Sequence, residues 1–445
     1  MMYPRLKLAR NLLREDGVIF VSIDDGEINN LRTLLNEVFG EENFVANFLW
    51  QKRYVSNATA KYVSDMHDHI ICFSREINHL KLGLVERTEE QLKDYKNPDC
   101  DPRGPWRAQD LSASKPYQAG LFRITGPTGQ LFSPPPGRYW RCNEATFREW
   151  IEDNRITFGR EGTGRPMLKA FLSETQEGIR PNTWWDHKFA GHNKEATLEV
   201  KALFGGESPF DTPKPTKLIR RMLDLIEDKD ALILDFFCGS GTTAHAVSQA
   251  THQDSGNRHF ILIQLPEKTD RSDYPTIADI TKARLRLATN EINATSSLFA
   301  GDLGFRVLKL DSSNILPWDP DREQLDQALL ESVEHLKSDR SDEDVLFEVL
   351  LKLGLELTVP VEQRAIAGKT VYTIGAGALY VCLDRSIAVA EAEPVALGLV
   401  AWHKELAPAG ESQVVFRDSA FINDVAKTNL TAILQQHGLT NVRSL

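Results

Sequence analysis

The stretch that decides the fold runs from Ala231 to Val247 and reads Ala-Leu-Ile-Leu-Asp-Phe-Phe-Cys-Gly-Ser-Gly-Thr-Thr-Ala-His-Ala-Val. An apolar run ends on Asp235, glycines follow at 239 and 241, and a helical pattern begins at Thr242. A strand, a glycine turn and a helix in this order bring backbone N–H groups and a helix N-terminus against a nucleotide-like ligand. A lone Gly-x-Gly is weak evidence, because a tight turn between a strand and a helix gives the same pattern.

A second segment lies shortly before the glycines. It runs from Phe210 to Ile219 and reads Phe-Asp-Thr-Pro-Lys-Pro-Thr-Lys-Leu-Ile. The wording Asp-Phe-Phe-Cys-Gly-Ser-Gly also differs from the Gly-x-Gly-x-x-Gly of dinucleotide-binding proteins. The two segments together therefore favour a ligand site over a plain turn.

In this order the two segments resemble the cofactor site of amino-methylating DNA methyltransferases of the permuted β group. From Tyr3 to Leu430 the chain resembles the modification subunit of a type III restriction system. The resemblance implies an α/β fold, a permuted Rossmann-like methyltransferase core with an inserted target-recognition domain and a C-terminal α+β domain. It also implies S-adenosyl-L-methionine as the cofactor and adenine N6 in a short DNA sequence as the methylated atom.

The resemblance places the cofactor contacts in the glycine loop and the Lys-Pro segment. The glycines lack a Cβ and permit tight turning and close ligand approach. Ribose hydroxyls call for a carboxylate at the end of the next strand, but Gln264 stands there. The Gln-Leu-Pro-Glu wording at 264–267 resembles that of the type III subgroup, so the resemblance assigns this contact to Glu267, and Gln264 could also bond a hydroxyl. The cofactor-binding residues are thus Lys214, Pro215, Thr216, Asp235, Phe236, Cys238, Gly239, Ser240, Gly241, Thr242, Gln264 and Glu267.

Other interpretations of the same residues stand beside this one. Cys238 lacks a nearby base in the sequence, so a small turn residue is favoured over a nucleophile. Proline at a first helical turn is common, which weakens the Lys-Pro signal. Gly239-x-Gly-x-x-Ala244, with Glu267 further on, satisfies a loose dinucleotide fingerprint and makes an NAD-dependent oxidoreductase the rival. The missing third glycine and the Lys-Pro segment count against that rival.

Hydrophobic periodicity predicts helices alternating with buried strands, which is typical of a doubly wound α/β sheet. We expect helices at 5–13, 27–39, 216–226, 242–250 and 277–288, and strands at 18–23, 44–50, 69–73, 231–235, 259–265, 370–374 and 378–383. We interpret Asp24 as part of a helix N-cap and expect an acidic helical segment after Trp318. The expected domains are the first part of the core (1–77), a target-recognition region (78–205), the cofactor-binding part of the core (206–300) and a C-terminal domain (301–445).

Prolines from Pro98 onward exclude long regular elements from the target-recognition region. Aromatic residues alternate there with cations, and residues 103–141 contain six basic residues and one acid, a net charge of +5. This pattern suits stacking on bases and contact with phosphates, although the aromatics could equally form a small irregular core. The expected DNA-binding residues are Arg103, Arg107, Lys115, Arg123, Arg138, Tyr139, Trp140 and Arg141.

Composition excludes several classes of protein. The net charge is −11, and residues 319–445 carry 11 basic and 20 acidic residues, a net charge of −9 that suits protein partners or a solvated surface. The five cysteines are odd in number without paired spacing, and no apolar stretch reaches the roughly 18 residues of a membrane span. We therefore expect free thiols in a reducing cytoplasm, and the resemblance implies a DNA-associated protein of bacteria or archaea. We expect no metal, because strand alternation places His67 and His69 on one face and Cys72 on the other.

The family's catalytic tetrapeptide, Asp-Pro-Pro-Tyr or a close variant, belongs before the position of Tyr3 in the family order. Residues 133–136 and 318–320 do not replace it, because they lack the acceptor, proline pair and aromatic together. We therefore assign no catalytic residue. We expect a truncated or split gene product that is inactive alone or works with a separately encoded N-terminal piece, and an absent βα unit that leaves an open sheet edge.

The resemblance also implies partners. They are double-stranded DNA, a second modification subunit in a homodimer, and a helicase-nuclease restriction subunit. The alternative function is that of a non-catalytic DNA-recognition subunit in a restriction or methylation complex.

Overall fold

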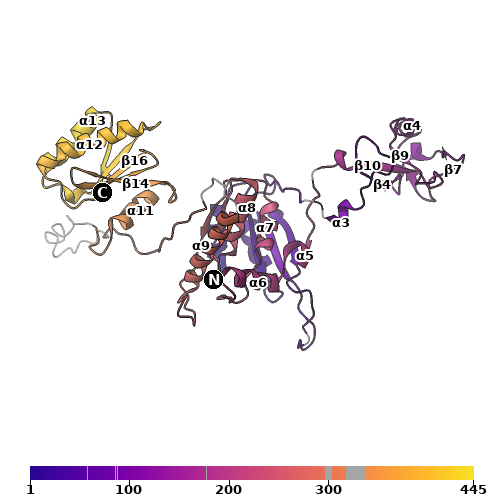
Figure 1. Cartoon of the computed structure of the whole chain (residues 1–445), viewed down its shortest axis with the longest axis horizontal. Helices are drawn as coiled ribbons and strands as arrows, with labels where there is room; N and C mark the ends of the chain where they lie inside the picture. The colour runs from indigo at the N-terminus through magenta and orange to yellow at the C-terminus, as the bar shows by residue number, and fades with distance from the viewer. Residues whose placement is uncertain (58, 86, 88, 177, 296–302, 317–335) are drawn as a thin grey trace. The chain divides into compact units, whose positions relative to one another are not determined.

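The computed structural model describes residues 1–445 except 58, 86, 88, 177, 296–302 and 317–335. The chain divides into two compact units, Met1–Leu303 and Gly304–Leu445, and Figure 1 traces them by colour. Among the described residues, no helix has the length and apolar character needed to cross a membrane. Much of the acidic helical segment expected after Trp318 lies outside the described residues.

Unit 1 contains a four-stranded sheet with the order β1-β3-β2-β11. Strands β1 and β2 pair antiparallel with β3, which lies between them, and β11 adds to β2 in parallel. The three strands expected at 18–23, 44–50 and 69–73 are confirmed, and β1 is left at the edge. The strands are β1 (Val18–Ile23), β2 (Phe44–Trp50), β3 (Asp68–Ser74) and β11 (Trp184–Trp185).

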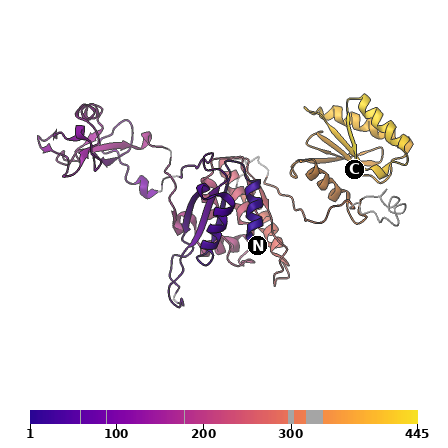
Figure 2. The same ribbon diagram turned by 180° about the vertical axis from the view of Figure 1, so that it is seen from behind.

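Helices cover both faces of this sheet. On one face, α1 (Met2–Leu12) and α2 (Ile28–Phe39) bury Leu6, Leu35 and Phe73, and Figure 2 shows these indigo helices from behind. On the other face, α7 (Thr216–Asp224) packs Leu218 against Trp50 and Cys72. The expectation that Asp24 caps α2 was wrong. The N-cap is Glu27, while Asp24 Oδ1 accepts the Gly26 N–H at 3.0 Å and closes the turn before it.

A second, two-stranded sheet carries the glycine stretch. Strand β12 (Leu232–Asp235) lies parallel to β13 (His259–Leu262) and leads into α8 (Thr242–Asp254). We expected β13 to reach residue 265, but it ends at Leu262. Its partner β12 ends at Asp235, whose backbone carbonyl accepts the Ile263 N–H as the last bond of the pairing. Helix α9 (Ile277–Thr295), expected to end at 288, continues to Thr295 and packs against α8. The short helices α5 (His187–Ala190) and α6 (Asn193–Leu203) precede α7.

The proline-rich region between these parts folds into short strands around its own core. A three-stranded sheet with the order β4-β10-β9 is accompanied by the pairs β5–β8 and β6–β7. Helix α4 begins after Asn143, whose side chain accepts the Thr146 N–H. The elements are α3 (Glu89–Leu92), β4 (Trp106–Asp110), β5 (Ser112–Ala113), β6 (Ile124–Thr125), β7 (Leu131–Phe132), β8 (Tyr139–Trp140), α4 (Glu144–Glu152), β9 (Ile156–Thr157) and β10 (Met167–Phe171).

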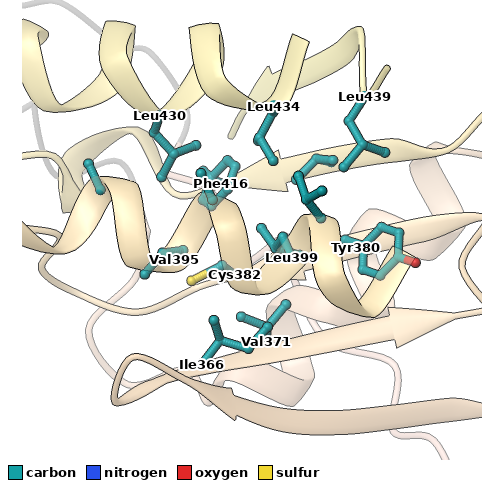
Figure 3. Close-up of a cluster of buried hydrophobic side chains, with 14 of the residues drawn as sticks. Ile366, Val371, Tyr380, Cys382, Val395, Leu399, Phe416, Leu430, Leu434 and Leu439 are labelled. Atoms are coloured by element: carbon teal, nitrogen blue, oxygen red, sulfur yellow. The ribbon is translucent and has the colours of Figure 1, made fainter. Parts of the chain in front are cut away.

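Unit 2 is a five-stranded mixed sheet with the order β14-β15-β16-β17-β18. Alternation along β16 sends Tyr380 to the face covered by α12 and α13 and Val381 to the face covered by α11. Figure 3 shows the first of these cores. Both expected strands, at 370–374 and 378–383, are confirmed. The elements are α11 (Asp342–Lys352), β14 (Val361–Ile366), β15 (Lys369–Ile374), β16 (Leu379–Cys382), α12 (Val389–Leu406), β17 (Gln413–Phe416), α13 (Asp424–Gln436) and β18 (Asn441–Ser444).

Two leucines of α12 test this core. Leu399 is fully buried, whereas Leu397 is 44% exposed. We predict that Leu399→Ala lowers the free energy of unfolding of unit 2 by about 2–5 kcal/mol, because it leaves a cavity. The matched Leu397→Ala changes it by less than about 0.5 kcal/mol. The measurement is urea-dependent hydrogen exchange of peptides from 369–416 in the full chain, and equal effects of the two changes would contradict the assigned core.

Candidate functional site

The glycine loop between β12 and α8 has a backbone that only glycine adopts easily. Gly239 has φ 50° and Gly241 has φ 79°, both in the left-handed region. A Cβ at Gly241 would lie 2.8 Å from Leu285 Cδ1 and 2.9 Å from Thr281 Cγ2 of α9. Both φ and space therefore demand glycine at position 241, where it is the N-cap of α8.

Side chains from β12, from α9 and from the segment after β13 hold this loop. Gln264 Oε1 accepts the Gly239 N–H at 2.8 Å, and Thr281 Oγ1 donates to Gly239 O at 2.5 Å. Asp235 Oδ2 accepts the Thr243 hydroxyl at 2.6 Å, which joins the end of β12 to the start of α8. The loop is therefore fixed before any ligand arrives, and the Gln264 carbonyl is already engaged in holding it.

The Lys-Pro segment lies against the glycine loop. Thr242 Oγ1 donates to Lys214 O at 3.2 Å. Pro215 is the N-cap of α7, and the Thr216 N–H and hydroxyl donate to Glu199 Oε2 at 3.2 and 3.1 Å. The structure thus brings together the two segments that the sequence singled out.

A buried ion pair fastens these segments to each other. Arg284 of α9 is 0% exposed and donates from one guanidinium nitrogen to Ser240 Oγ and Thr242 Oγ1, both at 2.8 Å. Its other terminal nitrogen donates to Glu199 Oε1 at 3.0 Å. Because Glu199 also accepts from Thr216, one Arg–Glu pair connects the glycine loop to the start of α7.

Sequence reasoning missed this pair. It treated Arg284 only as a residue of a helix and did not consider Glu199. A signal was present, because Arg284 stands four residues from both Ile280 and Ala288, which are each 1% exposed. A charged residue on the apolar stripe of a helix needs a partner, so the position of Arg284 was a sign of a buried ion pair that the sequence analysis did not use.

His245 of α8 lies beside the pair and stays neutral. Burial, helped by the charge of Arg284, lowers the pKa of His245 to about 3. Gln249 Nε2 lies 3.0 Å from His245 Nε2 and donates to it, which leaves a proton on Nδ1, 3.4 Å from Glu199 Oε1. Burial also raises the pKa of Glu199, and Arg284 opposes that shift.

The Lys214 side chain turns toward the four-stranded sheet. Its Nζ donates to Asp68 Oδ2 at 2.8 Å and lies 4.6 Å from the Trp50 ring centroid. Lys52 donates to the other oxygen of Asp68 at 2.8 Å. Burial alone would raise the pKa of Asp68, but Lys214 and Lys52 outweigh it and hold the pKa below its usual range. The ammonium of Lys214 thus joins the Lys-Pro segment to β3.

Three further predicted site residues occupy different surroundings. Burial, with the charge of Asp235 beside it, raises the pKa of the Cys238 thiol to about 12, so the thiol is protonated at neutral pH and is no nucleophile. Phe236 is half-buried, with its ring centroid 5.2 Å from that of Phe237. Glu267 follows β13 and is exposed to solvent.

Comparison with known proteins identifies the family of this chain. Residues 1–269 match the family of N6 and N4 DNA methylases, described as DNA methylase. The chain belongs to the DNA methylase family. The expected methyltransferase family and its α/β fold are thereby confirmed.

The methylase is similar to the StyLTI Mod subunit, a type III restriction-modification enzyme of Salmonella typhimurium, with 36% identity over 68% of this chain and 47% of the relative. It is 30% identical to the EcoPI Mod subunit of Escherichia phage P1, over 69% of this chain and 52% of the relative. The chain thus spans about half the length of both relatives. Among solved structures, the M1.HpyAVI–SAM complex matches at a TM-score of 0.28 and 12% identity, covering 63% of this chain and 82% of that one.

The predicted DNA-binding residues of the proline-rich region differ in their exposure and in their partners. Trp140 is 2% exposed and lies in the core with Phe132 and Phe147, so its ring is unavailable to a base. This corrects the expectation for Trp140, since the alternative of a small aromatic core holds for these three rings. Five of the predicted DNA-binding residues are exposed or partly exposed and form no ion pair among the described residues. They are Arg107, Lys115, Arg123, Tyr139 and Arg141.

Two predicted DNA-binding arginines already have acidic partners inside the region. Arg103 pairs with Asp101 at 2.9 Å and with Asp153 at 3.0 Å. Arg138 pairs with Asp110 at 2.7 Å and donates to Ser112. Because aspartate carboxylates pair with both guanidinium groups, less of their positive charge is available to DNA phosphates.

We predict that Arg284→Met lowers the free energy of unfolding by about 3 kcal/mol, because it leaves the largely buried Glu199 carboxylate, 21% exposed, without its cation. The double change Arg284→Met with Glu199→Met recovers part of this loss, since no unpaired charge then remains. Arg286→Met, on an exposed position of the same helix, serves as the control. Urea unfolding of the full chain measures all three, and a double variant less stable than Arg284→Met would contradict this account.

A pH titration tests His245. Its pKa of about 3 in the folded chain lies below the value of about 6.5 expected when unfolded, so acid protonates the unfolded chain first. The stabilisation is complete above about pH 6.5 and falls toward lower pH by up to about 1.4 kcal/mol per unit. We predict that His245→Gln flattens this part of the curve of unfolding free energy against pH. An unchanged slope would show that His245 is not buried in the neutral form.

Proposed function

We propose that this methylase binds S-adenosylmethionine between the glycine loop and the Lys-Pro segment and serves DNA adenine N6 methylation as part of a type III modification subunit. One observation carries the proposal. The two segments, separate in sequence, are held together at the end of a parallel strand by the buried Arg284–Glu199 pair. Ligands of open α/β sheets bind at the carboxyl ends of the strands, where this site lies.

The roles proposed at the site follow from placement. The glycines and the N-terminus of α8 leave backbone close to the methionine part and sugar of the cofactor. Glu267, exposed beyond β13, is the proposed partner of the ribose hydroxyls. Gln264 would support the same contact through the loop that it holds, since its carbonyl oxygen is bonded to the Gly239 N–H.

We further propose that methyl transfer needs a strand and an acceptor tetrapeptide in addition to the residues described here. Strands β1 and β12 each have one sheet neighbour among the described residues. Leu232 and Ile261, in β12 and β13, are 65% and 48% exposed, although strand residues of a doubly wound sheet are normally covered. The open edges and uncovered apolar side chains support an additional strand there.

The two open strands point the same way. Asp68 lies beside the end of β1, because Ile23 pairs with His69, and it binds Lys214 Nζ. The carbonyl of Lys214 in turn accepts from Thr242, at the start of α8, the helix that follows β12. A strand added between β1 and β12, parallel to both, would end beside the cofactor loop. A tetrapeptide following it would then meet a flipped adenine and align its N6 with the sulfonium methyl group.

The DNA partner would be held by the target-recognition region. Its exposed cations Arg107, Lys115, Arg123 and Arg141 suit phosphate contacts, and Tyr139 suits stacking on a base. Similarity to the Mod subunits supports a homodimer and a restriction subunit as further partners. A polypeptide that carries the tetrapeptide segment, whether fused to this chain or separate, would complete the site.

Cofactor binding tests the first step. We predict that the 445-residue chain binds S-adenosylmethionine in calorimetry and that Glu267→Gln weakens binding about 10-fold, the effect of losing about 1.4 kcal/mol of charged hydrogen bonding. Asp270→Asn, an exposed carboxylate three residues on, is the control and leaves binding unchanged. Absence of binding, or binding of NAD instead, would refute the proposed cofactor.

Nucleoside mass spectrometry tests the second step. DNA incubated with labelled cofactor and this chain alone is expected to remain unmethylated, and addition of the tetrapeptide segment of a Mod relative should yield N6-methyladenine. N4-methylcytosine would overturn the adenine assignment, and turnover by the 445 residues alone would overturn the need for the extra segment. DNA binding without cofactor binding would instead favour a non-catalytic recognition subunit.

A further inference from the structure

Three metal-ligating side chains converge where β1 ends beside β3. His67 and His69, two residues apart, lie on the same face with ring centroids 5.1 Å apart. Asp25, in the turn after β1, brings Oδ1 to 2.7 Å from His69 Nε2 and to 3.9 Å from His67 Nε2. One ligand atom from each residue lies within 4.8 Å of the others. Strand alternation predicted the histidine pair, and the fold adds the carboxylate.

These spacings fit a small transition-metal ion. Bond lengths of about 2.0–2.2 Å from zinc to nitrogen and oxygen place neighbouring ligand atoms of a tetrahedral site roughly 3.4 Å apart. The observed separations of 2.7 and 3.9 Å lie on either side of that value. The Asp25 side chain is 65% exposed, so its carboxylate is free to rotate by the small amount required.

A second shell for His69 is in place. Asn47 of β2 presents both its amide nitrogen, at 3.0 Å, and its amide oxygen, at 3.3 Å, to His69 Nδ1. Without metal, the Nε2 proton of His69 points to Asp25 and Nδ1 accepts from the amide. With metal, the Asn47 oxygen would accept a proton on Nδ1 and leave the Nε2 lone pair for the ion. Outer-shell contacts of this kind orient metal-binding histidines.

The charged groups near Asp25, His67 and His69 leave these three side chains free to bind a cation. Asp68, between the two histidines, is directed to the other face, where Lys52 and Lys214 occupy its two oxygens. Lys52 also pairs with Asp65. These ammonium groups are therefore already neutralised by carboxylates other than Asp25, which limits their repulsion of a cation at the cluster.

We propose that Asp25, His67 and His69 form a binding site for one divalent transition-metal ion, with zinc as the preferred occupant. Two imidazoles and one carboxylate are a ligand set of zinc sites that keep a fourth position for water. The bound ion would pin the turn after β1 to β3. This site shares no residue with the proposed cofactor site, and its existence does not depend on the proposed function.

Metal titration of the full chain tests the site. Calorimetry with Zn²⁺, and visible absorption with Co²⁺ as a probe of coordination, should each show one ion per chain. His67→Gln and Asp25→Asn should abolish binding, and Asn47→Ala should weaken it about 10–100-fold. Circular dichroism checks that each variant folds, which the exposure of Asp25 and the partial exposure of His67 favour.

His79→Gln is the matched control, because His79 pairs with a carboxylate, Glu15, at 3.0 Å outside the cluster. Its binding of Zn²⁺ should equal that of the unaltered chain. Absence of stoichiometric binding, binding that survives both His67→Gln and Asp25→Asn, or loss of binding in His79→Gln would each overturn the site.

Discussion

The Arg284–Glu199 pair is the interaction on which the candidate site depends. Burying a guanidinium and a carboxylate costs free energy unless both are paired and their remaining hydrogen bonds are made. Here Ser240 and Thr242 accept from one terminal nitrogen of Arg284 and Thr216 donates to Glu199, whereas Arg284 Nε has no hydrogen-bond partner among the described residues. The pair therefore holds only when the glycine loop, the start of α7 and helices α6 and α9 are all in place. Segments far apart in the sequence thus become one rigid surface.

Two strands near this surface have an open edge among the described residues. Lys214 joins β3 to the start of α8, while β1 and β12 have no hydrogen-bonded partner on one edge within the described part of the chain. Unpaired edges and exposed strand leucines and isoleucines are normally covered, because they invite pairing with other chains. The glycine loop and the Lys-Pro segment are thus held together beside two strands whose edges are open among the described residues.

Local signals predicted much of this structure. The apolar run before Asp235, the two glycines and the pattern after Thr242 specified strand, turn and helix, and alternation placed His67 beside His69. Contacts between distant segments were beyond such reasoning. Glu199 reaches Thr216 and Arg284 only through the packing of α6 on α9, and Trp140 became a core residue because short strands enclosed it. Pattern and composition describe neighbours in sequence, whereas these partners are neighbours only in space.

The most direct test of a cofactor site assembled by one buried pair is amide hydrogen exchange of the full chain with and without S-adenosylhomocysteine. The account predicts that this ligand protects 214–218 and 236–243 together, and that both protections disappear together in Arg284→Met. Protection limited to one of the segments, or unchanged by the substitution, would contradict it.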